Sequence, residues 1–280
     1  MSQLAPILDH VVINVLDQLD GAAALYRRLG FHLTERGHHT LGSSNHLAVF
    51  GENYLELLGF EPGRPTQRAD LWKHPPGLTG LVFKTADSLR LHSTLVDKAV
   101  PVENPAEFSR LVDLPQGTRD AAFRVVRLSS ELVPNGRVFF CHHLTPDLVW
   151  RNEWRDHPNG AVDIVEFVIA ANDPSRTADL YRRIFGSETV TEIPDGFALS
   201  AGRATVLFLT PDGVEGRYKG AASVDTSRGD RMVALTLRTR SLDLVNESVK
   251  SGRIPDIRTE AGRVVVPYQQ AGGVALAFVE

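Results

Sequence analysis

Two ionisable side chains near the start of the chain stand in segments that are otherwise suited to burial. Glu56 lies inside the apolar run 54–58, and His10 lies inside the β-branched run 7–15. An ionised carboxylate in such a run is costly unless a cation or hydrogen-bond donors satisfy it. A neutral imidazole and a carboxylate together suit zinc, iron, manganese or nickel. The ordinary alternatives are a hydrogen-bonded core histidine and a glutamate paired with an arginine across a sheet.

A second group of candidate side chains ends the run 138–143, where Cys141, His142 and His143 follow one another. Neighbouring residues of a strand face opposite sides, so at most one of the two histidines can readily face a site. Parity alone does not choose between them. The same geometry separates the thiol from the adjacent imidazole, so we expect Cys141 to be a packed thiol rather than an activated nucleophile.

Polar residues before the third expected strand are further candidates. Asn45 ends the segment 42–45, whose Gly, Ser and Asn residues are typical of a turn, and its side chain could reach a site. His38 and His39 lie in a polar segment, and we expect them to be exposed to solvent. A histidine in a mobile loop could still serve as an acid or base.

The elements that must position these residues recur four times, each time as a strand, a helix and further strands. The first unit has strands at 7–15, 31–35, 45–50 and 53–58, with a helix at 19–29; the second has strands at 78–84, 121–128 and 137–143, with a helix capped by Asp87 and a Pro-rich insertion at 101–118. The third has strands at 162–170, 196–200 and 204–209, with a helix begun by Asp173 and Pro174; the fourth has strands at 232–237, 263–268 and 274–279, with a helix at 242–251.

A local echo supports this repeat, because the segment YRRLGF at 26–31 returns as YRRIFG at 181–186. Repeats of this length are supersecondary units rather than solenoid steps. The sequence therefore predicts an α+β protein of four βαβββ modules, paired into an N-terminal domain at 1–150 and a C-terminal domain at 151–280. The alternative is a generic α+β protein with coincidental echoes.

Composition limits the classes of partner. A formal net charge of −4 and a pI near 6.2 do not indicate capture of nucleic acid or of an anionic membrane. The single cysteine excludes an internal disulfide and fits a reducing compartment. With neither a visible secretory signal nor a run of about 18 apolar residues, we expect a cytoplasmic protein with a small-molecule partner. The sequence leaves open whether the protein forms a homodimer.

The segments LDHVVINV at 8–15, HTLGSSNHL at 39–47 and YLEL at 54–57 resemble the glyoxalase-like branch of the vicinal-oxygen-chelate superfamily. That group also contains glyoxalase I, extradiol dioxygenases, bleomycin-resistance proteins and several epimerases. The resemblance implies a divalent-metal site inside a cup formed by paired modules, with His10, Glu56 and His143 as ligands. It also makes Asn45 a candidate substrate contact.

Gly80 departs from this pattern, because it stands where the opening strand of the second module would supply a ligand. The C-terminal modules offer Val165–Glu166 and Val206–Leu207–Phe208 at the corresponding places, so we expect no metal there. The leading hypothesis is a metal-dependent lyase or isomerase in which Glu56 is catalytic. The alternatives are a non-catalytic binding or resistance protein, and a ring-cleaving dioxygenase. The dioxygenase is less favoured, because two-domain members of that kind hold iron in the C-terminal pair.

Overall fold

The computed structural model describes residues 4–61, 63–114, 117–260 and 262–280. The chain forms two eight-stranded sheets of the same topology, with the orders β2-β3-β4-β1-β5-β8-β7-β6 and β10-β11-β12-β9-β13-β16-β15-β14. The first sheet comprises β1 Leu8–Leu16, β2 Gly37–His38, β3 Ser43–Val49, β4 Tyr54–Phe60, β5 Gly77–Lys84, β6 Ala106–Leu114, β7 Gly117–Arg127 and β8 Arg137–His143. The second comprises β9 Ala161–Ala170, β10 Val190–Ile193, β11 Gly196–Ala201, β12 Ala204–Leu209, β13 Arg231–Thr239, β14 Arg258–Glu260, β15 Arg263–Val266 and β16 Ala275–Val279.

Each module closes on itself through a parallel pair between its first and last strands. These pairs are β1 with β4, β5 with β8, β9 with β12 and β13 with β16. Two modules then meet along an antiparallel pair of first strands, β1 with β5 and β9 with β13. The predicted α+β fold of paired βαβββ modules is confirmed.

One long helix follows the first strand of each module. These helices are α1 Leu19–Arg28, α3 Ser88–Asp97, α4 Pro174–Phe185 and α6 Leu242–Ser251. The shorter helices are α2 Ala69–Trp72, α5 Pro211–Tyr218 and the 3-10 turns η1 Pro65–Arg68, η2 Ser130–Leu132, η3 Pro146–Leu148, η4 Asn152–Trp154, η5 Ser187–Thr189 and η6 Tyr268–Gln270. The expected caps are present, because Asp87 accepts hydrogen bonds from the backbone N–H groups of Leu89 and Arg90, and Asp173 accepts one from Arg176.

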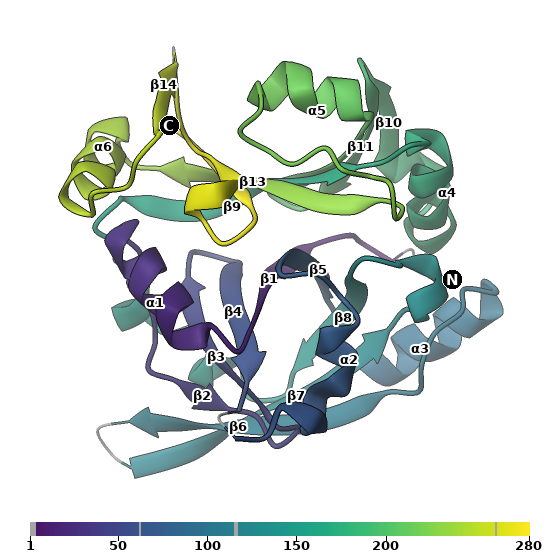
Figure 1. The fold of residues 1–280 in the computed structure, drawn as a ribbon. Helices are drawn as coiled ribbons and strands as arrows, with labels where there is room; N and C mark the ends of the chain where they lie inside the picture. Colours follow the sequence, from purple (N-terminus) through teal and green to yellow (C-terminus); the bar gives the residue numbers. More distant parts are fainter. Residues whose placement is uncertain (1–3, 62, 115–116, 261) are drawn as a thin grey trace.

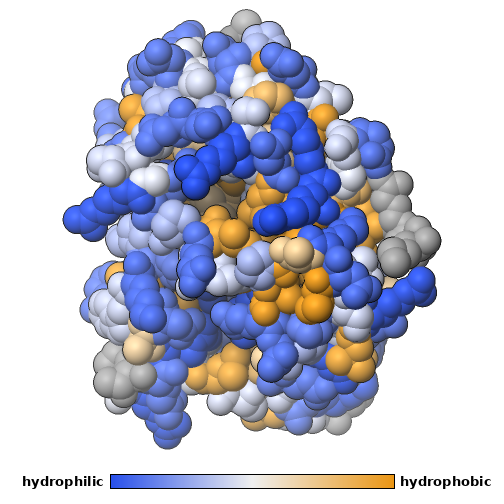
Figure 2. Space-filling model, turned by 90° about the vertical axis from the view of Figure 1, so that its right-hand side faces the viewer, coloured by the Kyte–Doolittle hydropathy of each residue, from blue (hydrophilic) through white to orange (hydrophobic). Residues whose placement is uncertain are grey.

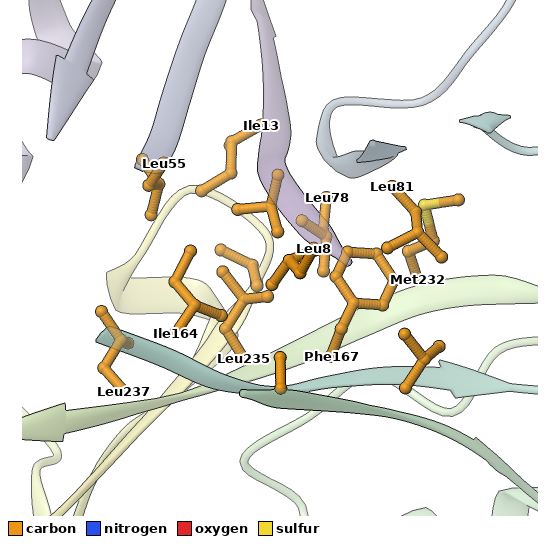
Figure 3. Close-up of a cluster of buried hydrophobic side chains, with 14 of the residues drawn as sticks. Leu8, Ile13, Leu55, Leu78, Leu81, Ile164, Phe167, Met232, Leu235 and Leu237 are labelled. Carbon is orange, nitrogen blue, oxygen red and sulfur yellow. The ribbon is translucent and has the colours of Figure 1, made fainter. Parts of the chain in front are cut away.

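The two sheets stack on their convex faces, with α1 and α6 on one flank and α3 and α4 on the other (Figure 1). One apolar core runs between them and continues under the helices. In Figure 3 the first sheet contributes Leu8, Ile13, Leu55, Leu78 and Leu81, and the second contributes Ile164, Phe167, Met232, Leu235 and Leu237. The concave face of each sheet holds a separate apolar cluster. Each sheet is therefore a cup that opens away from the other sheet.

Several segments differ from the expectation. Asn45 lies in a strand rather than in a turn, because β3 begins at Ser43, and the edge strands β10 and β14 were not expected. Residues 31–36 form no strand; Phe31 and Leu33 instead pack into the core, and the short strand β2 comes later. The Pro-rich insertion contains β6, which pairs with β7 as a hairpin. Alternation explains this strand, since Arg110 and Val112 are buried while the intervening Leu111 is exposed.

Side chains on the face in Figure 2 are mostly hydrophilic, with small apolar patches between them. Within the described part of the chain, no helix is long and apolar enough to cross a membrane.

His157 lies in the segment that connects β8 to β9, and its side chain is fixed to the first half of the chain. Its Nδ1 accepts a hydrogen bond from the backbone N–H of His32 at 3.0 Å, and its Nε2 donates to the carbonyl of Val49 at 3.0 Å. The ring also packs against Phe31 and Phe50. Burial lowers the pKa of His157 to about 4, so the imidazole is neutral in the folded protein near neutral pH.

Acid should therefore destabilise the fold through His157. Its pKa is lower in the folded protein than its ordinary value of 6.5, so the unfolded chain binds more protons and stability falls as the pH drops from 6.5 towards 4. The full shift corresponds to roughly 3 kcal/mol. Urea unfolding at pH 7.5 and pH 4.5 should show a smaller loss for His157→Gln than for the wild type. Equal losses would contradict the prediction.

Candidate metal centre

A cavity opens into the cup of the first sheet. It is lined by one residue of β1, by alternate residues of β3, β4 and β8, and by residues of β6, β7 and the segment that leads into β3. The lining residues are His10, His39, Leu41, Asn45, Leu47, Tyr54, Glu56, Leu58, Arg68, Phe108, Arg110, Phe123, Val125, Arg127, Arg137, Phe139 and Cys141. The site therefore combines apolar walls with imidazoles, one carboxylate and several guanidinium groups.

His10 is fixed from behind by its neighbour Asp9. An irregularity in the β1–β5 register lies between Leu8 and His10, and it lets the two adjacent side chains meet. The Nδ1 atom of His10 lies 2.6 Å from Asp9 Oδ1. Burial alone would raise the pKa of Asp9, but His143 and His10 lower it below its ordinary value. An ionised Asp9 can only accept, so Nδ1 of His10 donates this hydrogen bond and Nε2 is the ring atom that faces Glu56.

Glu56 faces His10 across the cavity. Its Oε2 lies 3.8 Å from His10 Nε2, and its Oε1 accepts a hydrogen bond from Asn45 Nδ2 at 2.6 Å. Burial raises the pKa of Glu56, but His39, His10 and the Asn45 hydrogen bond outweigh it and lower the pKa overall. Tyr54 stacks on the His10 ring at a centroid distance of 4.3 Å and limits its rotation. The predicted residues His10, Glu56 and Asn45 are thus brought together.

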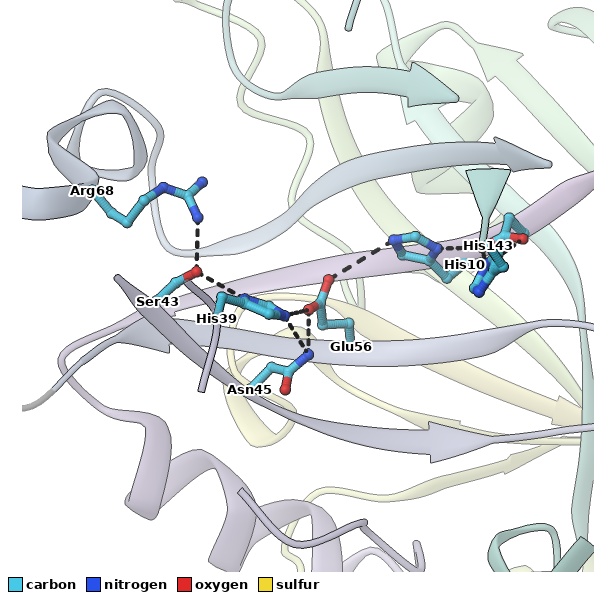
Figure 4. Close-up of polar contacts among 8 residues, drawn as sticks. His10, His39, Ser43, Asn45, Glu56, Arg68 and His143 are labelled. Atoms are coloured by element: carbon cyan, nitrogen blue, oxygen red, sulfur yellow. Dashed lines mark hydrogen bonds and ion pairs between the residues drawn. The ribbon is translucent and has the colours of Figure 1, made fainter. Parts of the chain in front are cut away.

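His39 also belongs to this cluster, and the expectation that it is exposed is wrong. Its Nδ1 contacts Ser43 Oγ at 2.9 Å, and its Nε2 lies 3.9 Å from Glu56 Oε1 and 3.2 Å from Asn45 Nδ2 (Figure 4). Burial lowers the pKa of His39 to about 4, although Glu56 partly opposes the shift. The imidazole is therefore neutral at neutral pH. No pattern in the sequence indicates this burial, because β6 pairs with the segment at His39 only in the folded chain.

His143 lies on the cup side of β8, and His142 lies on the opposite side. The Nδ1 of His142 is 3.4 Å from Ser88 Oγ at the start of α3. The Nε2 of His143 lies 2.9 Å from Asp9 Oδ1. In Figure 4 His143 therefore stands beyond His10, on the side away from Glu56. Its Nδ1 is buried without a hydrogen-bond partner, and ligation by His143 stays a prediction.

A second group of donors lies beside the cavity, next to His10. Atoms of Asp9, Cys141 and His143 come within 4.8 Å of one another. Of these three residues, Cys141 lines the cavity. Burial raises the pKa of Cys141 well above its ordinary value, so the thiol is protonated without a metal. The three residues have the donor types of a metal site. Asp9 and His143, however, are not among the residues that line the cavity.

Gly80 supplies no donor, and the structure gives a steric reason. A Cβ atom at this position would lie 2.5 Å from the Cβ of Val12, so no side chain fits. In the second cup, Glu166 accepts hydrogen bonds from Arg217 and Thr236, which satisfy the carboxylate.

The arginines of the cavity were not expected from the sequence. Arg110 comes from β6, Arg137 begins β8, and Arg68 ends η1. The signal for Arg137 was available, since it shares the two-residue period of Phe139, Cys141 and His143. No periodic pattern in the sequence indicates that Arg68 lines the cavity, because η1 is placed beside the cup only by the tertiary fold.

The geometry of this cup agrees with a match to a known family. The model described as a glyoxalase-like domain matches residues 8–185, which is more than half of the chain. The chain belongs to the glyoxalase-like domain family. This family is part of the vicinal-oxygen-chelate superfamily, so the resemblance seen in the sequence is confirmed. No curated protein matches the chain significantly.

Solved structures share the fold at low sequence identity. A hypothetical protein from Staphylococcus aureus matches with a TM-score of 0.65 and 14% identity, covering 97% of this chain and 98% of its own. A xylose isomerase-like TIM barrel/4-hydroxyphenylpyruvate dioxygenase fusion protein matches with a TM-score of 0.58 and 13% identity, covering 100% of this chain and 50% of its own. A triple mutant of 4-hydroxymandelate synthase from Streptomyces coelicolor matches with a TM-score of 0.57 and 11% identity, covering 99% of this chain and 92% of its own.

Proposed function

We propose that the cup of the first sheet is the active site of a divalent-metal-dependent lyase or isomerase acting on a small oxygen-chelating substrate. The observation that supports it most is the pair formed by His10 Nε2 and Glu56 Oε2, which lie 3.8 Å apart at a cavity. The Asp9 carboxylate behind His10 is the outer partner that metal-binding histidines usually have.

The donor set fits zinc, iron, manganese or nickel. Donors about 2.1 Å from a metal lie about 3 Å apart, so His10 and Glu56 need only small rotations to share an ion. His39, 3.9 Å from the other carboxylate oxygen, is the third donor in this proposal. Two imidazoles and one carboxylate leave coordination positions open for a substrate. His143, implied by the family resemblance, is the competing third ligand.

A metal held there supplies Lewis-acid polarisation of two adjacent substrate oxygens. The residues of the chain orient and shield the reacting groups. Asn45 holds Glu56, the proposed catalytic residue, through the hydrogen bond that its Nδ2 donates to Oε1. Phe108 and Phe123 stack on each other and line the cavity, where they exclude water.

Metal content tests the proposal. Protein reconstituted with each of the four metals should hold about one ion per chain by elemental analysis, and His10→Ala should lose it. His142→Ala is the matched control and should retain the metal, because His142 lies on the far side of the sheet. His39→Ala and His143→Ala identify the third ligand, and Cys141→Ser tests the group formed by Asp9, Cys141 and His143.

A chain that binds no metal under any condition would favour the second candidate, a non-catalytic small-molecule-binding protein. The absence of a donor at Gly80, and at Val82 opposite His10, supports that alternative. A dioxygenase is suggested by the name of one matched structure. Oxygen consumption that depends on the metal would favour a dioxygenase over the lyase or isomerase.

A further inference from the structure

The cavity of the first cup holds more positive charge than its own carboxylate balances. Arg68, Arg110, Arg127 and Arg137 line it, while Glu56 is the one carboxylate among the lining residues of the described chain. Charges taken out of water are costly unless they are paired. The partners of each guanidinium group therefore indicate which of them is available to a ligand.

Two of the arginines are paired within the protein. Arg68 binds Asp70 with the edge of its guanidinium group, because Nε and Nη2 each lie 2.9 Å from one carboxylate oxygen. Arg127 Nη1 lies 3.7 Å from Glu103 Oε2. Arg68 and Arg127 also line an adjoining groove, as does Arg137, and their partners Asp70 and Glu103 lie in that groove.

Arg137 presents the same edge without a partner. Its Nε and Nη2 atoms are buried and have no hydrogen-bond partner. Arg68 binds Asp70 through the same two atoms. Two parallel N–H groups match the two oxygens of a carboxylate. Burial, Arg68 and Arg127 lower the pKa of Arg137 to about 10, so the group is still charged at neutral pH. The ring of Phe139, 5.8 Å away, helps to hold its plane.

Arg110 adds a second unpartnered donor. It is 3% exposed, and its Nη2 is buried without a hydrogen-bond partner. Glu56 contributes an attractive charge to both Arg110 and Arg137, so both cations lie near the proposed metal ligand.

Resting on the proposed function, we propose that the substrate is an organic acid whose carboxylate is bound by the Nε–Nη2 edge of Arg137, with Arg110 donating to a second oxygen of the same molecule. The apolar walls formed by Phe108 and Phe123 then contact the rest of the substrate. A singly charged carboxylate is favoured over a phosphate, because the nearby Glu56 repels a second negative charge.

Calorimetric titration with benzoate tests this assignment, with benzamide as the neutral isostere and phenyl phosphate as the larger anion. We expect benzoate to bind about tenfold or more tightly than benzamide, and Arg137→Gln to weaken benzoate binding by about the same factor. Arg124→Gln is the matched control, because Arg124 pairs with Glu107 outside the cavity. It should bind benzoate as the wild type does.

A second readout separates a binding role from a structural one. Removing an unpaired buried charge should stabilise the ligand-free protein, so Arg137→Met should raise the melting temperature while it weakens benzoate binding. A lower melting temperature with unchanged benzoate binding would show that Arg137 is structural and overturn the proposal. Tighter binding of phenyl phosphate than of benzoate would overturn the assignment to a carboxylate.

The titrations are made on metal-loaded protein and on protein stripped with a chelator. Benzoate binding that depends on Arg137 in the stripped protein upholds the inference even if no metal is ever bound. Metal binding without benzoate binding in either form overturns the inference and leaves the proposed function intact.

Discussion

Glu56→Gln should lower the affinity of the protein for divalent metal by about 100-fold or more and abolish metal-dependent turnover. Glutamine has the shape of glutamate, and its carbonyl oxygen can still accept the hydrogen bond from Asn45. It lacks the negative charge that attracts a cation between His10 and His39. The measurement is a competitive metal titration against a chromophoric chelator.

Glu61→Gln is a matched control for this substitution. Glu61 pairs with His38 at the outer end of β4, with 2.9 Å between Oε1 and Nδ1, and it does not line the cavity. The control variant should bind metal as the wild type does. Wild-type affinity in Glu56→Gln would remove Glu56 from the ligand set and direct attention to Asp9, Cys141 and His143.

Phe83→Ala should cost about 3–5 kcal/mol of unfolding free energy, the usual range for removing a fully buried phenylalanine. Phe83 lies on β5 in the first sheet, yet its ring packs against two aromatic rings of α4 in the second half. Its ring centroid lies 4.9 Å from that of Phe185 and 6.3 Å from that of Tyr181. It also contacts Phe140 at 5.7 Å on β8. The cavity left by alanine therefore weakens the packing between the two halves as well as within one.

Urea unfolding followed by tryptophan fluorescence and by circular dichroism measures this loss. Because one apolar core joins both sheets, we expect the two signals to change together in the wild type. Leu89→Ala is the control, since Leu89 is 56% exposed on α3 and should change stability by no more than about 0.5 kcal/mol. A loss no greater than that of the control would show that Phe83 does not couple the halves.

Local patterns were enough to predict the modules. The helical spacing of Leu19, Ala22, Ala23 and Tyr26 corresponds to the buried face of α1, and the caps at Asp87 and Asp173 are present. These features depend on residues a few positions apart, whose interactions survive in any fold that contains the element. The unusual polar residues in apolar runs, His10 and Glu56, stood out for the same local reason.

The sequence by itself thus determined the four repeating modules, the family and the first two members of the candidate site. Only the tertiary structure decided that His39 joins them, that His143 lies against Asp9, and that Arg137 lines the cavity while its Nε and Nη2 atoms lack partners. These contacts join residues far apart in the chain, across strands whose pairing and curvature place them. Hydrogen bonds between residues far apart in the chain, and the burial of their side chains, depend on the folded shape. Neither produces a periodic pattern in the sequence.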